Sequence, residues 1–582
     1  MIVSVDIMQL FIFVQLYINL IYSQIEKMTQ LVKFCAAFAS VLIIIGLIYC
    51  IILGADGVKS IMGWDVENCV YSGFSFSLVD RLGYILLAAL IILALLTLIF
   101  FKTDRFIQLM QGGIRCIREN ISATWNAIWY SKLKYILPIP LITYVYFAVT
   151  LPITHDEATT YIYYISSSVM ETISLYTMPN NHILFSLLAK PFAAISFIDL
   201  QLAVRLPAIL VSMLTWPILY RFVRKFYSEN TALAVTAISS MGSMIITYSV
   251  FSRGYSMITF FVVVCLYAAY NIINEGNKVR HWTIFTISGI LGFYTIPTFL
   301  YPFIAINLFI LIYNYKSIGK QIYYNILLGA ITYLLYMPVF IVMGIEAITD
   351  NSFVEPLTFS ILMERIYPFL IGIVTDIYGI VYYVTIPVIV LLIAYSIMQK
   401  DRRVFILWLL FLGTPFVIIF GQSMIPFTRT FCYLGVIIIL LTGILFDKQL
   451  RKISGRKLLV ALVIIQIAGS IHFACRSQFI VMMFASFEEL VNDYLTENKS
   501  YAYRCDYLDP NIRFEIKRRG LKNIRLESLP TDSVSADTIR GFDYIIIERK
   551  NDVTKLKQPT DTVPYGYQHR ILDIYYDKDK DK

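Results

Sequence analysis

Two adjacent carboxylates early in the chain are the first candidates for chemistry. Asp156 and Glu157 follow His155 in the segment Pro152-Ile-Thr-His-Asp-Glu-Ala-Thr-Thr-Tyr161, directly after an apolar run. A carboxylate at a membrane surface is partly desolvated, which can tune it toward work as a general base. A solvated acidic turn, or a helix N-cap formed by Thr154 or Asp156, is the alternative interpretation.

Three further side chains stand where they could meet a phosphate. His182 follows Asn181 at a predicted helix start, where free backbone N–H groups also favour anions. Arg253 and Arg429 occupy very short turns between apolar runs, and an arginine held there is costly and a functional candidate by default. The alternatives are a simple helix cap for Asn181 and His182, and snorkelling of the arginines to lipid headgroups. The whole set suits a reaction between a lipid-phosphate donor and an acceptor outside the membrane.

The composition describes the protein that must position these groups. The 582 residues have a mean hydropathy of +0.69, with 58% hydrophobic and 15% charged residues. Of the 87 charged residues (48 Lys and Arg, 39 Asp and Glu), 36 fall after residue 475. We therefore expect an all-α polytopic membrane protein with a small soluble α/β domain at its C-terminus. Walker, G-x-G-x-x-G, H-E-x-x-H and C-x-x-C motifs are absent from the sequence, so ATP hydrolysis, zincin and metal-knuckle chemistry have no local support.

The topology follows from the positive-inside rule, because the number of crossings between two cytoplasmic basic clusters is even. Three apolar runs, 135–151, 182–198 and 204–220, lie between basic clusters, so one of them must not span. We expect 182–198 to lie at the outer interface, which makes 152–203 one large outer loop. The total is about 13–14 transmembrane helices, with the higher number applying if the run 7–23 also spans the membrane.

Three parts follow from this count. Residues 1–134 form extra N-terminal helices and a basic cytoplasmic loop, 135–475 form the catalytic membrane domain, and 476–582 form the soluble domain outside. In the last part the patterns predict helices over 487–494 and 509–519 and strands over 524–529 and 542–547. Translation from Met28 and a signal peptide over 7–23 are left open. The run 282–315 is far too long for one span and must turn near Pro297 or Pro302.

An ordered set of motifs resembles the C-type glycosyltransferase (GT-C) superfamily. The resemblance is to the branch of protein O-mannosyltransferases and lipid A aminoarabinose transferases, over about residues 135–475. The matching segments are HDEATTYIYY (155–164), NNHILFSLLAK (180–190), RLPAILVSMLTWPILYRFVRKFY (205–227), ITYSVFSRGYSMITFFVVVCLY (246–267), LGFYTIPTFLYPF (291–303), DNSFVEPLTF (350–359) and PFTRTFCYL (426–434).

This resemblance implies an inverting transfer of a sugar from a polyprenyl-phosphate carrier. The family base falls on Asp156, with Glu157 as its companion. The region of Asn181 and His182 resembles the part that meets donor phosphate or metal, and Arg253 and Arg429 would stabilise the departing phosphate. His155, Asn181, Tyr255 and Tyr294 would line the substrate site.

Two departures from the family pattern leave open whether the site binds a divalent metal ion. The sequence indicates no other cofactor. Ile296 follows Tyr294-Thr295 where many relatives carry a histidine, and no acidic residue stands at Gly254 or Tyr255. The expected partners are the polyprenyl-phosphate sugar, a protein, lipid or glycan acceptor, and the bilayer, with no nucleic acid. The expected location is a bacterial inner membrane with the site facing the periplasm.

Three competing interpretations stay open. An O-antigen-type polymerase or ligase also has many helices and a large outer loop, but typically a later one. A lipid or glycan transporter would place polar residues at mid-helix depth, whereas the ionisable residues here crowd the outer ends. A non-catalytic scaffold of the same fold is the third.

Overall fold

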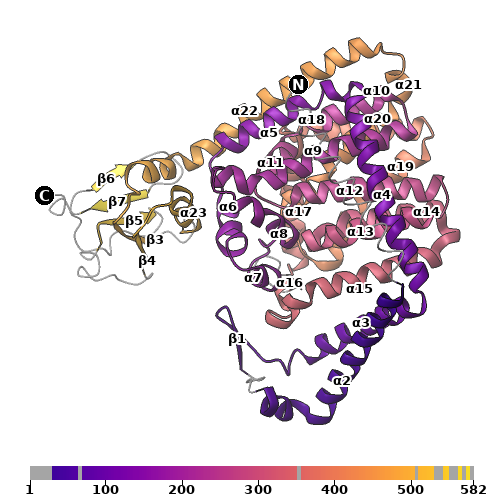
Figure 1. Cartoon of the computed structure of the whole chain (residues 1–582). Helices are drawn as coiled ribbons and strands as arrows, with labels where there is room; N and C mark the ends of the chain where they lie inside the picture. The colour runs from indigo at the N-terminus through magenta and orange to yellow at the C-terminus, as the bar shows by residue number, and fades with distance from the viewer. Residues whose placement is uncertain are drawn as a thin grey trace.

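The long apolar runs fold into helices, because a chain inside a bilayer must satisfy its backbone hydrogen bonds internally. The computed structural model describes residues 29–62, 68–349, 356–504, 509–529, 542–548, 562–565 and 572–576. Within them, a large helical body carries a small sheet domain at one end of the last long helix (Figure 1). The fold class expected from the composition is thus confirmed, while the run 7–23 lies outside the described residues.

The N-terminal segment forms a helical hairpin beside the body (Figure 1). Helix α2 (Thr29–Met62) is followed by two short antiparallel strands, β1 (Cys69–Tyr71) and β2 (Phe74–Phe76), and then by α3 (Leu82–Phe101). Helix α4 (Thr103–Trp129) links this hairpin to the body and packs against its other helices.

Thirteen helices form the main part of the helical body within the described residues. They are α5 (Pro138–Thr150), α9 (Leu200–Phe226), α10 (Glu229–Ser239), α11 (Ser243–Val250), α12 (Tyr255–Asn274), α13 (Val279–Thr295), α14 (Leu300–Asn314), α15 (Ile318–Val342), α17 (Phe359–Tyr378), α18 (Tyr382–Met398), α19 (Arg402–Gln422), α20 (Tyr433–Leu445) and α22 (Gly455–Asp493).

Other helical segments connect these thirteen helices. They are η1 (Lys132–Tyr135), α6 (His155–Thr160), the π-helical turn η2 (Tyr161–Ile165), α7 (Val169–Ser174), α8 (Ile183–Ala193), η3 (Pro297–Phe299), η4 (Tyr315–Ser317), α16 (Glu346–Thr349), η5 (Thr428–Phe431) and α21 (Asp447–Leu450).

In the described part of the chain, nine helical stretches are long and apolar enough to cross a membrane, or eleven if two bent pairs are each one span. The run 282–315 divides as predicted, since α13 ends at Thr295 and η3 begins at Pro297. The two bent pairs were predicted as single helices. The α10–α11 pair bends by 68° and the α17–α18 pair by 86°. Helix α17 ends because Gly379 adopts a left-handed conformation with φ +72°, the usual way to stop a helix.

Helix α8 is too short to span. Its 11 residues rise about 16 Å, about half of the roughly 30 Å of a hydrocarbon core. Lys190, the one charge on this apolar helix, donates its ammonium to the carbonyls of Tyr164 at 2.8 Å, Ile165 at 3.1 Å and Ser167 at 2.5 Å. These carbonyls lie in and after η2, where they lack helical partners.

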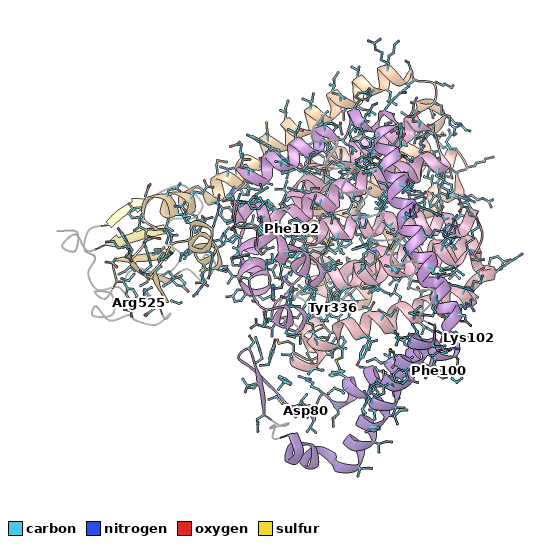
Figure 2. The ribbon with its side chains drawn as sticks, in the orientation of Figure 1. Asp80, Phe100, Lys102, Phe192, Tyr336 and Arg525 are labelled. Carbon is cyan, nitrogen blue, oxygen red and sulfur yellow. The ribbon has the colours of Figure 1, made fainter. Side chains whose placement is uncertain are left out.

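The predicted basic loops meet at one end of the body. Lys225 pairs with Glu275, which also binds Arg280 at 3.3 Å, and Arg403 donates to Asn274 at 2.9 Å. These contacts join the end of α9, the α12–α13 loop and the α18–α19 loop. Lys102, which starts another basic cluster, is far from α6 and α7, on the other side of the body (Figure 2).

The C-terminal domain is a five-stranded sheet with one described helix. Its strands are β3 (Ser500–Arg504), β4 (Arg525–Ser528), β5 (Tyr544–Glu548), β6 (Thr562–Tyr565) and β7 (Leu572–Tyr576), in the order β4-β3-β5-β7-β6. Strand β3 is parallel to β4 and β5, whereas β7 is antiparallel to β5 and β6.

Helix α23 (Asp509–Arg519) lies between this sheet and the helical body (Figure 1). The two strands and both helices predicted in the tail are present, although the first predicted helix is the end of α22. Buried residues of that end, Phe487 and Val491 among them, share one apolar core with Tyr501 and Ile546 of the sheet. The last long helix of the body is therefore continuous with the soluble domain.

Candidate active site

Glu157 forms a capping box with Thr154 at the N-terminus of α6 and binds this helix to the helical body. Its Oε2 accepts hydrogen bonds from the backbone N–H and the hydroxyl of Thr154, both at 3.0 Å. Arg205, on α9, donates to both carboxylate oxygens at 2.8 Å, and the N–H of Ser252 donates to Oε1 at 2.7 Å. Both side chains of the ion pair are fully buried. The carboxylate of Glu157 is thus occupied in fixing the helix that carries Asp156.

Asp156 keeps part of its carboxylate accessible. Its side chain is 36% exposed, and its Oδ2 lies 3.3 Å from Nη2 of Arg429. Burial on its own would raise the pKa of Asp156, but the positive charges of Arg253, Arg429 and His155 outweigh burial and hold the pKa below its ordinary value. Asp156 is therefore ionised at neutral pH and available to accept a proton.

Arg253 lies in the turn between α11 and α12 and is 1% exposed. Its Nη1 donates to the hydroxyl of Thr160 at 2.7 Å and to the carbonyl of Asn180 at 3.0 Å. It has no ion pair among the residues that the structure describes, so its charge acts on Asp156 without a direct contact between the two charged groups.

The ring of His182 fixes the turn that carries Arg253. Its Nδ1 accepts a hydrogen bond from the N–H of Gly254 at 2.8 Å, and its Nε2 lies 3.2 Å from Nη2 of Arg253. Burial, together with Arg253 and Arg429, holds the pKa of His182 well below its ordinary value, so the ring is neutral. A Cβ at Gly254 would lie 2.6 Å from Thr295 Cγ2 and 3.0 Å from His182 Cβ, which leaves room for glycine alone.

Arg429 is oriented by an aromatic ring and a phenol. Its Nε donates to the hydroxyl of Tyr255 at 3.0 Å, and its Cζ lies 4.1 Å from the centre of the Phe427 ring. The preceding Thr428 donates its hydroxyl to Oδ2 of Asp376, on α17, at 2.9 Å. Because the Arg429 side chain is 28% exposed, it can exchange its contact with Asp156 for another anion.

Four separate parts of the chain thus meet at one place: α6, the start of α8, the α11–α12 turn and η5. They bring a half-exposed ionised carboxylate, one accessible guanidinium and a second, buried guanidinium together. Such a group of side chains can accept a proton and bind an anion at neighbouring positions.

Comparison with known proteins gives this geometry a context. A family model described as dolichyl-phosphate-mannose-protein mannosyltransferase matches residues 180–354. The fold is similar to that of ArnT from Cupriavidus metallidurans, in the apo state (TM-score 0.51) and bound to undecaprenyl phosphate (TM-score 0.50). Each alignment covers 76% of this chain and 97% of ArnT, with 9% sequence identity. No curated protein matches the sequence.

The resemblance read from the ordered motifs is therefore confirmed, because residues 180–354 match that family model and the chain shares the fold of ArnT.

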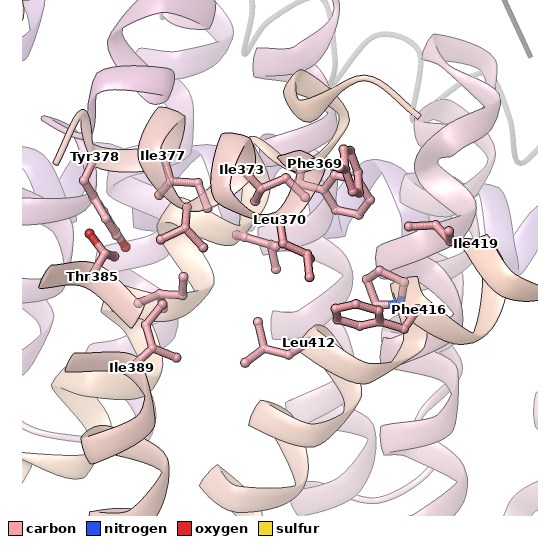
Figure 3. A pocket seen from close by; sticks show the side chains of 15 residues that line it. Phe369, Leu370, Ile373, Ile377, Tyr378, Thr385, Ile389, Leu412, Phe416 and Ile419 are labelled. Carbon is pink, nitrogen blue, oxygen red and sulfur yellow. The ribbon is translucent and has the colours of Figure 1, made fainter. Parts of the chain in front are cut away.

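An apolar pocket of about 90 Å³ lies between helices of the body (Figure 3). Helices α17, α18, α19 and α20 and the short helix η5 contribute the residues that line it, which include Phe369, Ile373, Ile377, Leu412, Phe416 and Phe431. Phe431 belongs to η5, the same short helix as Arg429. One residue of the pocket lining therefore lies two positions after the accessible arginine.

Other residues predicted for the site lie elsewhere or are occupied. Asn181 is fully buried, and its amide donates to the carbonyls of Thr172 and Leu175, both at 2.8 Å. Tyr294, at the end of α13, is 7% exposed and packs in an aromatic cluster with Tyr336. Neither contacts Asp156. Tyr255 reaches the site through Arg429, and His155 directly precedes Asp156, with its Nε2 3.4 Å from the Thr159 hydroxyl.

A metal-ligand set was left open by the sequence. Among the described residues, no group of three or more His, Cys, Asp or Glu side chains is arranged to hold a metal ion. Because the neighbouring Glu157 is fully paired with Arg205, the charges that act on Asp156 come from Arg253, Arg429 and His155, and this setting suits an anion better than a metal ion.

Sequence reasoning missed Arg205 and Asp376 as parts of the site. Arg205 stands at the start of an apolar run, and its charge there was the same signal that singled out Arg253 and Arg429. Asp376 gave no comparable signal, because its contact with Thr428 joins α17 to η5, which are far apart in the sequence and meet only in the folded body.

Proposed function

We propose that this protein is a GT-C-type glycosyltransferase that transfers a sugar from a polyprenyl-phosphate carrier to an acceptor hydroxyl, with inversion and with Asp156 as the general base. The observation that carries the proposal is the accessible, ionised carboxylate of Asp156 beside the guanidinium of Arg429. The ArnT structure bound to undecaprenyl phosphate and the mannosyltransferase family model support a lipid-phosphate donor.

In this mechanism Asp156 accepts the proton of the acceptor hydroxyl as its oxygen attacks the anomeric carbon. The bond from that carbon to the phosphate oxygen breaks, and the phosphate leaves on its lipid. A glycosidase needs a second carboxyl group to protonate its leaving group. A lipid phosphate needs none, because it leaves as an anion and positive charge stabilises it.

We assign the other residues to two roles. Arg429 leaves Asp156 and binds the departing phosphate, while the buried Arg253 supplies a fixed positive charge. Glu157, Asn181 and His182 act as positioning residues, because hydrogen bonds within the protein engage all three. The first isoprene units occupy the apolar pocket beside Phe431.

We further propose that the site faces the periplasm of a bacterial inner membrane, with the acceptor being a protein, lipid or glycan. The gathering of the basic loops at the opposite end of the body supports this orientation. The division into an N-terminal hairpin, a catalytic domain and a soluble domain near residues 134 and 475 is part of the same proposal.

The test is release of polyprenyl phosphate by purified full-length protein in detergent. Wild type, Asp156→Asn and the exposed control Asp80→Asn would each receive a panel of polyprenyl-phosphate sugars and candidate acceptors, with and without EDTA. We expect release by wild type and control, and a loss of about 10²–10⁴-fold in Asp156→Asn. Binding of undecaprenyl phosphate should persist in the variant.

Two outcomes would redirect the assignment. Equal release by wild type and Asp156→Asn would remove Asp156 as the base and favour an arginine-dependent polymerase or ligase. Lipid binding and translocation without release from any donor and acceptor pair would favour a transporter.

A further inference from the structure

The soluble domain makes direct contact with the segment that carries Asp156. Helix α23 packs against α6 and η2, and the ring of Phe514 meets that of Tyr161 edge-on at 5.2 Å between centroids. Phe514 is fully buried at this contact. A domain that merely completed the fold would not need to reach the loop between α5 and α8.

Each of three successive backbone carbonyls before Asp156, at positions 151 to 153, accepts a hydrogen bond from a side chain. Arg205 donates to the carbonyls of Leu151 and Pro152, both at 2.8 Å. The next carbonyl, that of Ile153, accepts from Nδ2 of Asn511, on α23, at 3.0 Å. Asn511 is fully buried. The helical body therefore holds two of the three carbonyls, and the soluble domain holds the third.

A second contact ties the same helix to the start of α9. Arg518 donates to Oδ2 of Asp199 at 2.8 Å and to Oε1 of Gln201 at 3.2 Å. Gln201 in turn donates its amide to the carbonyl of Leu151 at 2.9 Å. Thus α23 reaches the backbone before Asp156 both directly, through Asn511, and indirectly, through Gln201.

We propose that the soluble domain belongs to the catalytic apparatus and that Asn511 is a positioning residue for Asp156. The carbonyl that Asn511 binds lies three residues before Asp156, next to the N-cap residue Thr154 of α6. Release of this carbonyl would let the first turn of α6 shift, and small misplacements of a reacting group cost up to about 10²-fold in rate. The part of this proposal that concerns catalysis rests on the proposed function.

The experiment compares full-length Asn511→Asp with wild type and with Asn523→Asp, an exposed asparagine of the same domain. The Asn511 variant keeps the shape of the side chain and replaces the N–H donor by an acceptor. Hydrogen–deuterium exchange of peptides over 152–165 should become about tenfold faster. Exchange of peptides over the sheet strands should stay unchanged, and the control should match wild type throughout.

Kinetics give the second readout. With the donor and acceptor identified above, Asn511→Asp should lower kcat by about tenfold to 10²-fold and leave the KM for the donor unchanged. If no donor supports release by wild type, the proposed function fails while the exchange experiment still decides whether Asn511 holds the segment.

Unchanged exchange over 152–165 in Asn511→Asp would overturn the proposal. If the sheet peptides of that variant also exchange faster, the domain itself is disturbed, and Arg518→Gln decides instead. Arg518 is at the rim of the same contact, with a side chain that is 31% exposed, so its loss should be tolerated by the domain. It should accelerate exchange over 152–165 alone, and a wild-type pattern there would also overturn the proposal.

Discussion

Asp156 Oδ2 and Arg429 Nη2 lie 3.3 Å apart, although the two residues belong to the first and the last of the loops that form the site. The pair leaves both groups partly exposed and places an ionised carboxylate beside a guanidinium. The neighbouring Glu157–Arg205 pair is fully buried instead. Two carboxylates adjacent in sequence therefore serve different purposes, one accessible and one structural.

Removal of Arg429 should move the acid limb of the pH profile. In wild type the pKa of Asp156 lies below its ordinary value of 3.8, so the base stays ionised and activity is not limited by its protonation at pH 5–8. In Arg429→Gln the burial penalty remains and one opposing positive charge is lost, so the pKa of Asp156 rises. Activity should then fall at a higher pH on acidification, measured as kcat/KM against pH. Arg365→Gln, at an exposed arginine, is the control, and an unshifted limb in Arg429→Gln would contradict the predicted coupling.

Glu157→Gln should destabilise the protein. The substitution leaves the guanidinium of Arg205 buried without a counter-charge, and breaking a buried ion pair costs about 3–5 kcal/mol. The measurement is thermal unfolding in detergent, followed by tryptophan fluorescence, with the exposed Glu364→Gln as control. A melting temperature equal to that of wild type would show that Glu157 does not anchor α6.

Gly254→Ala should perturb the turn that carries Arg253. The added methyl group would lie 2.6 Å from Thr295 Cγ2, and overpacking of this kind costs about 1–3 kcal/mol. The double variant Gly254→Ala with Thr295→Ser removes the obstructing methyl group and should recover part of the loss in thermal stability. Gly413→Ala, where a Cβ meets nothing within 4 Å, should leave stability unchanged. No recovery in the double variant would mean that the clash is not with Thr295.

Leu412→Trp should block the apolar pocket. The larger side chain fills the space of about 90 Å³ beside Phe431, and loss of one buried isoprene unit is expected to weaken undecaprenyl phosphate binding by about tenfold or more. Binding can be measured by microscale thermophoresis with the protein in detergent. Leu391→Trp, on the exposed face of α18, is the matched control. Equal affinities for all three proteins would place the lipid elsewhere.

The sequence was informative where the physics is local. Apolar runs, basic loops and the parity of crossings predicted the helices and the non-spanning character of α8. The charges of Asp156, Arg253 and Arg429 marked the site because an ionisable group near a membrane is costly. The bends in the α10–α11 and α17–α18 pairs were missed, since each pair is apolar enough as a whole to pass for one span, although Gly242 and Gly379 lie at the breaks.

Other contacts could not be predicted because they depend on tertiary neighbours. Glu157 and Asp156 look equivalent in sequence, and only the partner Arg205 separates a structural carboxylate from an accessible one. His182 appeared suited to a phosphate, but burial beside two arginines keeps it neutral. Asn511 stands in an ordinary polar helix, and nothing in its local sequence points to Ile153.

The contact between Asn511 and Ile153 also sets an order of assembly. The two residues are 358 positions apart, so at a synthesis rate of about 5–20 residues per second the ribosome makes the second roughly 20–70 s after the first. The helices of the body can insert into the bilayer during that interval, while the turn before Asp156 still lacks one of its hydrogen-bond donors. Completion of the site would then be a late event of biogenesis. Nascent chains in the translocon would have no transferase activity until α23 has emerged and docked.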